Sequence, residues 1–84
     1  MRVRVRLFAG LREATGSEKL ELELREGASV EDAWRCLAGR HPALEPRRAS
    51  LAAAVNRAYA GFDAKLADGD EVAFIPPVSG GRGD

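Results

Sequence analysis

Two adjacent glycines near the end of the chain, Gly80 and Gly81, are the residues whose type and spacing best suit a chemical task. Pro76 and Pro77 precede them, and since proline cannot donate a ladder hydrogen bond, they end the last strand and leave a thin arm beyond it. Glycine has no Cβ, so this arm could thread a narrow channel. The pattern favours a protein whose own C-terminal carboxylate reacts. A frayed terminus without a chemical role fits the composition equally well.

Other residue types that could support chemistry occur singly. His41 precedes Pro42 in a polar loop without a second histidine, so we interpret it as a surface residue rather than a metal ligand or catalytic group. Cys36 is the only cysteine, which is typical of a reducing compartment. There is no Ser/His/Asp set and no phosphate-binding glycine loop. The sequence therefore predicts a cytoplasmic protein that binds no metal or cofactor and is not an enzyme by itself.

Length and charge exclude several classes of function. A chain of 84 residues makes one domain, and at this size folding removes only roughly 60–65% of the unfolded surface from water. A surface-based function is thus favoured over an enclosed active site. The formal net charge is zero, so no global field attracts nucleic acid or an anionic membrane. No apolar run approaches the ~20 residues of a membrane span, and we expect neither a nucleic-acid nor a membrane partner.

Two segments alternate strictly between apolar and charged residues. Residues 2–7 place three arginines on one face, and residues 19–24 place lysine and glutamates there. Such alternation indicates half-buried strands. Paired antiparallel, they set Arg2, Arg4 and Arg6 near Glu21 and Glu23, so the arginines are interpreted as a solvated sheet face rather than a nucleic-acid stripe.

One helix and further strands complete the expected fold. Ser29 is a good N-cap with Asp32 three residues on, and an apolar stripe follows at helical spacing until Gly39. Residues 51–55 fit helix or strand, residues 58–60 a short strand, and residues 71–75 the closing strand, which can pair with the first only in parallel. The fold class is α+β, a mixed sheet with one main helix packed across it. We expect this domain over residues 2–76 and a flexible C-terminal arm over residues 77–84.

Three apolar residues fall out of phase with the core. If Val3, Val5 and Leu7 point inward, Phe8 points outward, and Ile75 likewise follows the inward Phe74. Together with Tyr59 on the short strand, Phe8 and Ile75 could form one exposed apolar patch at the base of the arm, which is typical of a partner-binding surface. The alternative is that each of them tucks under a loop.

Four segments together resemble a known family. They are Phe8-Ala9-Gly10-Leu11-Arg12-Glu13, Ala53 with Val55-Asn56, Leu66 with Asp68-Gly69-Asp70-Glu71-Val72, and Pro76-Pro77-Val78-Ser79-Gly80-Gly81. The chain is similar to MoaD, the small sulfur-carrier subunit of molybdopterin synthase, in the ubiquitin-like β-grasp superfamily. The proline pair argues against the thiamine-pathway carrier ThiS, which shares the Gly-Gly end.

The resemblance implies the chemistry of the arm. An adenylating enzyme (MoeB-like) uses ATP to activate the carboxylate of Gly81, and a sulfur donor converts it to a thiocarboxylate. The arm then enters the large synthase subunit (MoaE-like), where Gly80 gives clearance and sulfur passes to a pyranopterin precursor to build the dithiolene. The resemblance places Phe8, Tyr59 and Ile75 in the contact with that subunit. It also places the arm residues Pro76, Pro77, Val78 and Ser79 in the same interface.

The chain departs from the family pattern after Gly81, because Arg82-Gly83-Asp84 follow and occupy the carboxyl that must react. Either a protease trims this tail, or the chain is part of a fused carrier and synthase, or this copy is inactive as a carrier. Alternative functions are a ubiquitin-like protein modifier, a sulfur carrier for thiamine or tRNA thiolation, and a β-grasp module that binds partners non-covalently.

Overall fold

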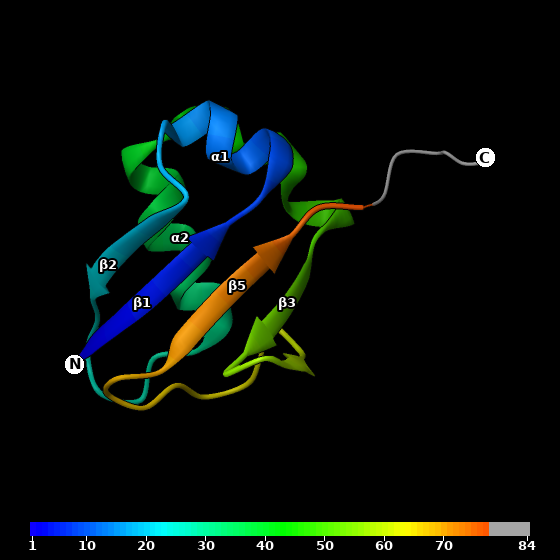
Figure 1. Ribbon diagram of the computed structural model, residues 1–84. Helices are drawn as coiled ribbons and strands as arrows, with labels where there is room; N and C mark the ends of the chain where they lie inside the picture. Colours follow the sequence, from blue (N-terminus) through cyan, green and yellow to red (C-terminus); the bar gives the residue numbers. More distant parts are fainter. Residues whose placement is uncertain (78–84) are drawn as a thin grey trace.

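The computed structural model describes residues 1–77 of the chain, and these residues form strands and helices (Figure 1). In chain order they are β1 (Arg2–Leu7), α1 (Ala9–Thr15), β2 (Lys19–Glu23), α2 (Val30–Arg40), the 3₁₀ helix η1 (Pro42–Ser50), β3 (Ala52–Val55), β4 (Ala58–Ala60) and β5 (Glu71–Ile75). The expected α+β class is confirmed.

The strands form one mixed sheet in the order β2-β1-β5-β3-β4. β1 pairs antiparallel with β2 and parallel with β5, so the predicted parallel pairing of the first and last strands is confirmed (Figure 1). β3 pairs antiparallel with both β5 and β4. β5 is therefore the central strand, and the arm continues from the middle of the sheet.

Charges across β1 and β2 follow the predicted pairing at one end only. Arg2 lies opposite Glu23, with 3.4 Å between Nε and a carboxylate oxygen, and Arg4 lies opposite Glu21. Arg6, however, lies opposite Lys19. The expectation of an acidic neighbour is thus confirmed for Arg2 and Arg4, and for Arg6 it is wrong because the register places a second cation opposite it.

Helix α2 begins at the predicted cap. The backbone N–H of Asp32 donates to the Ser29 hydroxyl at 3.2 Å, and the Asp32 carboxylate accepts the Ser29 N–H at 2.9 Å. This hydrogen bond from the Ser29 backbone is the main reason that the pKa of Asp32 is lowered. The helix runs past Gly39 to Arg40, one residue beyond the predicted end.

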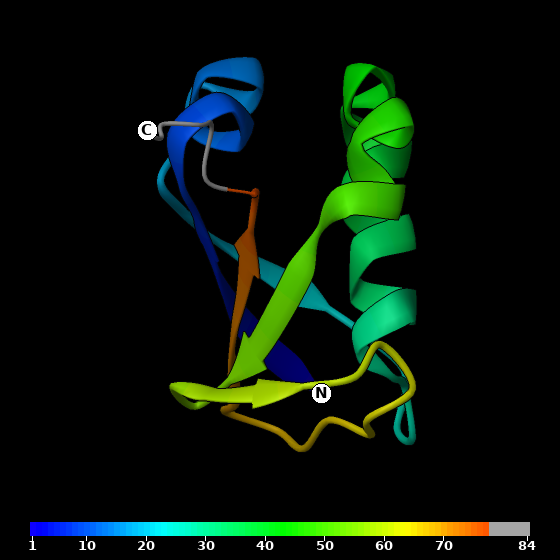
Figure 2. The same ribbon diagram turned by 90° about the vertical axis from the view of Figure 1, so that its right-hand side faces the viewer.

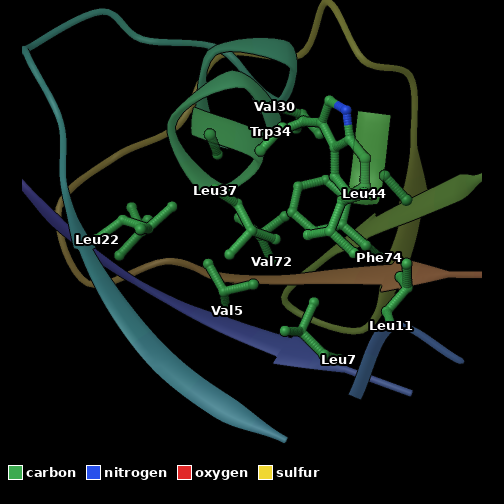
Figure 3. Close-up of a cluster of buried hydrophobic side chains, with 14 of the residues drawn as sticks. Val5, Leu7, Leu11, Leu22, Val30, Trp34, Leu37, Leu44, Val72 and Phe74 are labelled. Carbon is green, nitrogen blue, oxygen red and sulfur yellow. The ribbon is translucent and has the colours of Figure 1, made fainter. Parts of the chain in front are cut away.

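The apolar face of α2 packs across one face of the sheet (Figure 2). The core centres on Trp34, whose ring meets Phe74 of β5 edge to face with 5.1 Å between centroids (Figure 3). Around this pair lie buried side chains from both layers: Val3, Val5, Leu7, Leu11, Leu22, Val30, Leu37, Leu44 and Val72. Because α2 covers only one face, the opposite face of β1 and β5 remains outward.

Residues 42–50 form the 3₁₀ helix η1, which connects α2 to β3. It places Leu44 fully in the core and Arg48 against Glu31 of α2. The residues after it, which by sequence fit helix or strand, form β3. Helix α1 ends at Gly16, which has φ 76°. Within residues 1–77, no helix is long and apolar enough to cross a membrane.

Candidate functional site

Phe8 faces outward because β1 ends one residue before it. Its backbone is extended (φ −126°, ψ 155°), the next residue, Ala9, has φ 49°, and the Phe8 carbonyl accepts a hydrogen bond from Leu11 N at 3.0 Å. The turn leaves the Phe8 side chain 39% exposed. The Arg6 guanidinium lies 5.5 Å from the centre of the Phe8 ring, so a cation borders this apolar side chain.

Ile75 closes β5 with the alternation that the sequence predicts. Val72 and Phe74 are fully buried, whereas Ile75 on the other face is half-buried. Pro76 is half-buried and Pro77 is exposed, and with Pro77 the described residues end. The predicted arm residues Val78, Ser79, Gly80 and Gly81, and the tail after them, lie outside the described residues.

Tyr59 is presented by a tight hairpin. It lies in β4 opposite Ala54, and its side chain is 81% exposed. Asn56 and Arg57 form the turn with φ of 50° and 72°, the left-handed conformations that two-residue hairpins require. The side-chain amide of Asn56 donates to the carboxylate of Asp70 at 2.9 Å. The amide oxygen of Asn56 accepts the backbone N–H of Glu71 at 3.0 Å. The hairpin is thereby tied to the start of β5.

Phe8, Tyr59 and Ile75 surround one shallow hollow of about 260 Å³, which we call the apolar hollow. Ala54 and Ala73 are neighbours across β3 and β5 and form its floor, because a methyl group leaves space that a larger side chain would fill. Its remaining lining residues are the charged Arg6, Arg57 and Glu71. The hollow is thus apolar in the middle and charged at its edges.

The structure brings together the three out-of-phase residues that the sequence singles out, and their role in binding a partner stays a prediction. Sequence reasoning missed the floor residues Ala54 and Ala73. Alternation along the two strands could have found Ala73, since it falls between the inward Val72 and Phe74.

The isolated histidine and cysteine lie away from the apolar hollow. His41 caps the C-terminus of α2, where its backbone N–H donates to the carbonyl of Leu37 at 3.0 Å, and the residue is half-buried. Cys36 is half-buried on the flank of the same helix. Among residues 1–77, no three His, Cys, Asp or Glu side chains are grouped so that they could hold a metal ion.

The sequence is similar to curated proteins over nearly its whole length. It is 41% identical over 83 residues to the molybdopterin synthase sulfur carrier subunit of Chlamydomonas reinhardtii, covering 96% of this chain and 100% of that protein. It is 40% identical to the protein of that name in Escherichia coli, with 94% and 99% covered. It is also 40% identical to small archaeal modifier protein 1 of Haloferax volcanii, with 90% and 97% covered.

Solved structures of similar proteins show the same fold, the ubiquitin-like β-grasp. The crystal structure of the Haloferax volcanii modifier matches with a TM-score of 0.88 and 36% identity, over 96% of this chain and 100% of that one. A chain in the crystal structure of the Amycolatopsis orientalis BexX/CysO complex matches with a TM-score of 0.73 and 29% identity, over 94% and 99%. Proteins of this fold therefore occur in complexes with a partner chain.

The family match spans residues 5–81 and includes both glycines of the predicted arm. Together with relatives that share about two fifths of its residues over almost the entire chain, this match shows that the chain belongs to the ThiS family.

Proposed function

We propose that this protein is the sulfur-carrier subunit of a molybdopterin synthase, carrying sulfur as a thiocarboxylate on Gly81. The observation that carries the proposal is the combination of β5 and Gly80-Gly81: a central strand ends beside the apolar hollow, and the glycine pair follows it in sequence within the family match. The names of the relatives in Chlamydomonas reinhardtii and Escherichia coli support the same function.

The chemistry takes place at the Gly81 carboxylate. One of its oxygens attacks the α-phosphate of ATP on an adenylating partner, releasing pyrophosphate and forming an acyl-adenylate. Hydrosulfide from a sulfur donor then attacks the acyl carbon, AMP leaves with the electron pair of the broken C–O bond, and the S–H proton is lost to water. The resulting thiocarboxylate is the nucleophile that delivers sulfur to a pyranopterin precursor on the large synthase subunit. This protein contributes the carrier group and its placement, and the partners contribute ATP and catalysis.

The fold supplies the reach and the anchor that this transfer requires. The six residues from Pro76 to Gly81 span roughly 20 Å when extended, enough to enter a buried active site. The two prolines restrict the first part of the arm. The apolar hollow lies at its base, so a partner that covers Phe8, Tyr59 and Ile75 would receive the arm in a fixed direction.

Activation requires that Gly81 end the chain. Its carboxyl is joined to Arg82 by a peptide bond, and the family match stops at residue 81. We therefore include in the proposal that a peptidase hydrolyses this bond, with water adding across it to give the Gly81 carboxylate and the free amine of Arg82. The charged residues Arg82 and Asp84 would also obstruct a channel that fits glycines.

Three forms of the protein test this proposal, ending at Asp84, Gly81 and Gly80. Each is incubated with the adenylating enzyme, ATP and a sulfur donor, and its mass is then measured. We expect an adenylate and then a thiocarboxylate only on the form ending at Gly81. The form ending at Gly80 fails because its carboxylate lies about 3.5 Å short, and a misplacement of about 1 Å already costs a hundredfold in rate. Thiocarboxylation of the full chain at Asp84, with dithiolene synthesis, would refute the assignment to Gly81.

A second candidate function is attachment to lysines of other proteins through Gly81. It is favoured by the similarity to the Haloferax volcanii modifier in both sequence and structure. Both functions proceed through the same acyl-adenylate and differ in the nucleophile that follows, a sulfur donor or a lysine amine. Isopeptide adducts in place of the thiocarboxylate would identify this second function.

A further inference from the structure

A second hollow adjoins the apolar hollow on the outward face of the sheet, and its lining carries three cations and two carboxylates. It has a volume of about 260 Å³, and we call it the basic hollow. Its lining residues are Arg4, Val5, Arg6, Lys19, Leu20, Glu21 and Glu71. It shares Arg6 and Glu71 with the apolar hollow, so the two form one continuous surface.

The basic hollow contains an unfavourable charge arrangement. Arg6 and Lys19 lie directly opposite each other on β1 and β2, and like charges in that position destabilise a sheet. Within residues 1–77 neither cation forms an ion pair, whereas the neighbouring Arg2 pairs with Glu23 and Glu21. The free protein therefore keeps a repulsion that a glutamate at position 19 would remove.

The carboxylates of the basic hollow offset its cations only in part, since three cations and two carboxylates leave one net positive charge. Glu21 lies opposite Arg4 and also 3.8 Å from Nε of Arg2, which lies outside the basic hollow. Glu71 lies opposite Arg4 across β1 and β5. Within the described residues no carboxylate forms an ion pair with Arg6 or Lys19, and Arg6 also borders Phe8. A negative group placed over them would be attracted while its neighbours cover the apolar hollow.

We propose that the basic hollow binds an aspartate or glutamate side chain of the large synthase subunit that docks on the apolar hollow. This inference rests on the proposed function, since it concerns the same partner. A protein carboxylate is favoured over a nucleotide phosphate for two reasons. The two hollows are continuous, so one protein surface covers both, and Glu21 and Glu71 would repel a group with several negative charges. Charges at such a rim mainly accelerate association.

The chain offers a matched test, because it has only two lysines, Lys19 and Lys65. Both side chains are exposed. The backbone of Lys65 forms an isolated antiparallel bridge with Ser29, and Lys65 does not line the basic hollow. Lys19→Glu and Lys65→Glu change the net charge equally. Both are made in the form ending at Gly81, which retains every described helix and strand. Affinity and association rate for the large subunit are measured at low and high ionic strength, together with the melting temperature of the free carrier.

We expect Lys19→Glu to weaken binding about threefold to tenfold at low ionic strength, and less when salt shortens the Debye length to about 10 Å or below. The same substitution should raise the melting temperature by roughly 2–4 °C, because it replaces a like-charge pair by an opposite one. Lys65→Glu should change neither property. If Lys19 had only a structural role, a substitution that raises the melting temperature would not also weaken binding to the large subunit.

Equal affinities of Lys19→Glu and the unchanged carrier would overturn the inference while leaving the proposed function intact. Absence of binding by the unchanged carrier itself would instead count against the proposed function. Saturable binding of ATP to the carrier alone, lost in Lys19→Glu, would assign the basic hollow to phosphate and also overturn the inference.

Discussion

Phe8 holds its outward position through the backbone of its neighbour. Ala9 has φ 49°, a conformation that costs a residue with a Cβ about 1 kcal/mol or more. The chain accepts this strain where β1 turns into α1, and Leu11 of that helix is fully buried. The packing of α1 thus stabilises a turn that directs an aromatic ring away from the core.

Replacing Phe8 by alanine should weaken binding to the large subunit about fivefold to thirtyfold, a loss of about 1–2 kcal/mol. The ring is a large apolar group at the edge of the apolar hollow, and a docked partner would remove it from water. Titration of one purified protein with the other measures the effect.

The melting temperature of Phe8→Ala serves as the control, since a side chain that is 39% exposed in the free protein contributes little to the core. Unchanged affinity at an unchanged melting temperature would remove Phe8 from the interface.

At the level of elements, Arg48 joins η1 to two other parts of the fold. Its Nε donates to a carboxylate oxygen of Glu31 at 3.0 Å, and its guanidinium lies 3.5 Å from the centre of the Phe62 ring. Phe62 in turn stacks on Phe74 of β5, with 6.1 Å between centroids. The hydrogen bond from Arg48 is the main reason that the pKa of Glu31 is lowered. One side chain thus links η1, α2 and the loop before β5.

Arg48→Ala should lower the free energy of unfolding by about 1 kcal/mol at neutral pH, since a partly exposed ion pair and a cation–π contact each contribute up to about that amount. A carboxyl whose folded pKa is lowered stabilises the fold above its ordinary pKa of 4.5 and loses that contribution as pH falls through the folded value. The difference from the unchanged protein should therefore shrink in acid. Thermal unfolding across the pH range measures it.

Arg35→Ala is the matched control. Arg35 lies 4.0 Å from the same carboxylate of Glu31, but its side chain is 75% exposed. We expect its loss to cost a few tenths of a kcal/mol at most. An equal effect of the two substitutions would show that the contact of Arg48 with Phe62 adds nothing.

Sequence periodicity predicted the elements whose apolar residues repeat regularly, and it failed where tertiary contacts decide. β1, β2 and β5 alternate, and α2 carries a helical stripe after its cap, so each was predictable. The 3₁₀ helix η1 contains Pro46 and one buried side chain, Leu44, and its stability depends on contacts such as that of Arg48 with Glu31. The alanines of β3 have no preference of their own and become a strand because β5 and β4 flank them.

In the candidate site, too, regular alternation made some residues predictable, and the residues that depend on strand pairing were not. Phe8 and Ile75 interrupt a regular alternation, which marks them in the sequence. The register that opposes Arg6 to Lys19 depends on how β2 pairs with β1, and alternation alone does not fix that pairing.

At the level of the whole molecule, the two faces of the sheet have different roles, core packing and proposed partner binding. One face packs on α2 and holds the core (Figure 2). The outward face carries the apolar and basic hollows. Because β5 is central and the proposed reactive terminus follows it in sequence, this terminus and the proposed docking surface are attached to the same strand. Substitutions on the outward face should therefore alter partner binding with little loss of stability.

Protein isolated from its native host should contain a species that ends at Gly81 and has one carboxyl oxygen replaced by sulfur. The proposed trimming and activation both occur in the cell, so intact mass records them together. Larger species joined through Gly81 to a lysine would support the modifier, and a population consisting only of untrimmed chains would contradict the carrier.

The central position of β5 also affects how the protein is made. A ribosome releases β1 first and β5 last, yet β5 is the strand that joins the β1–β2 pair to the β3–β4 pair. Until β5 emerges, no strand joins the β1–β2 pair to the β3–β4 pair, and closing the sheet must bring together the most distant parts of the sequence. The arm follows directly from the strand that completes this closure. Co-translational folding therefore couples the two events: a chain with its docking face correctly assembled has already synthesised the strand from which its reactive end extends.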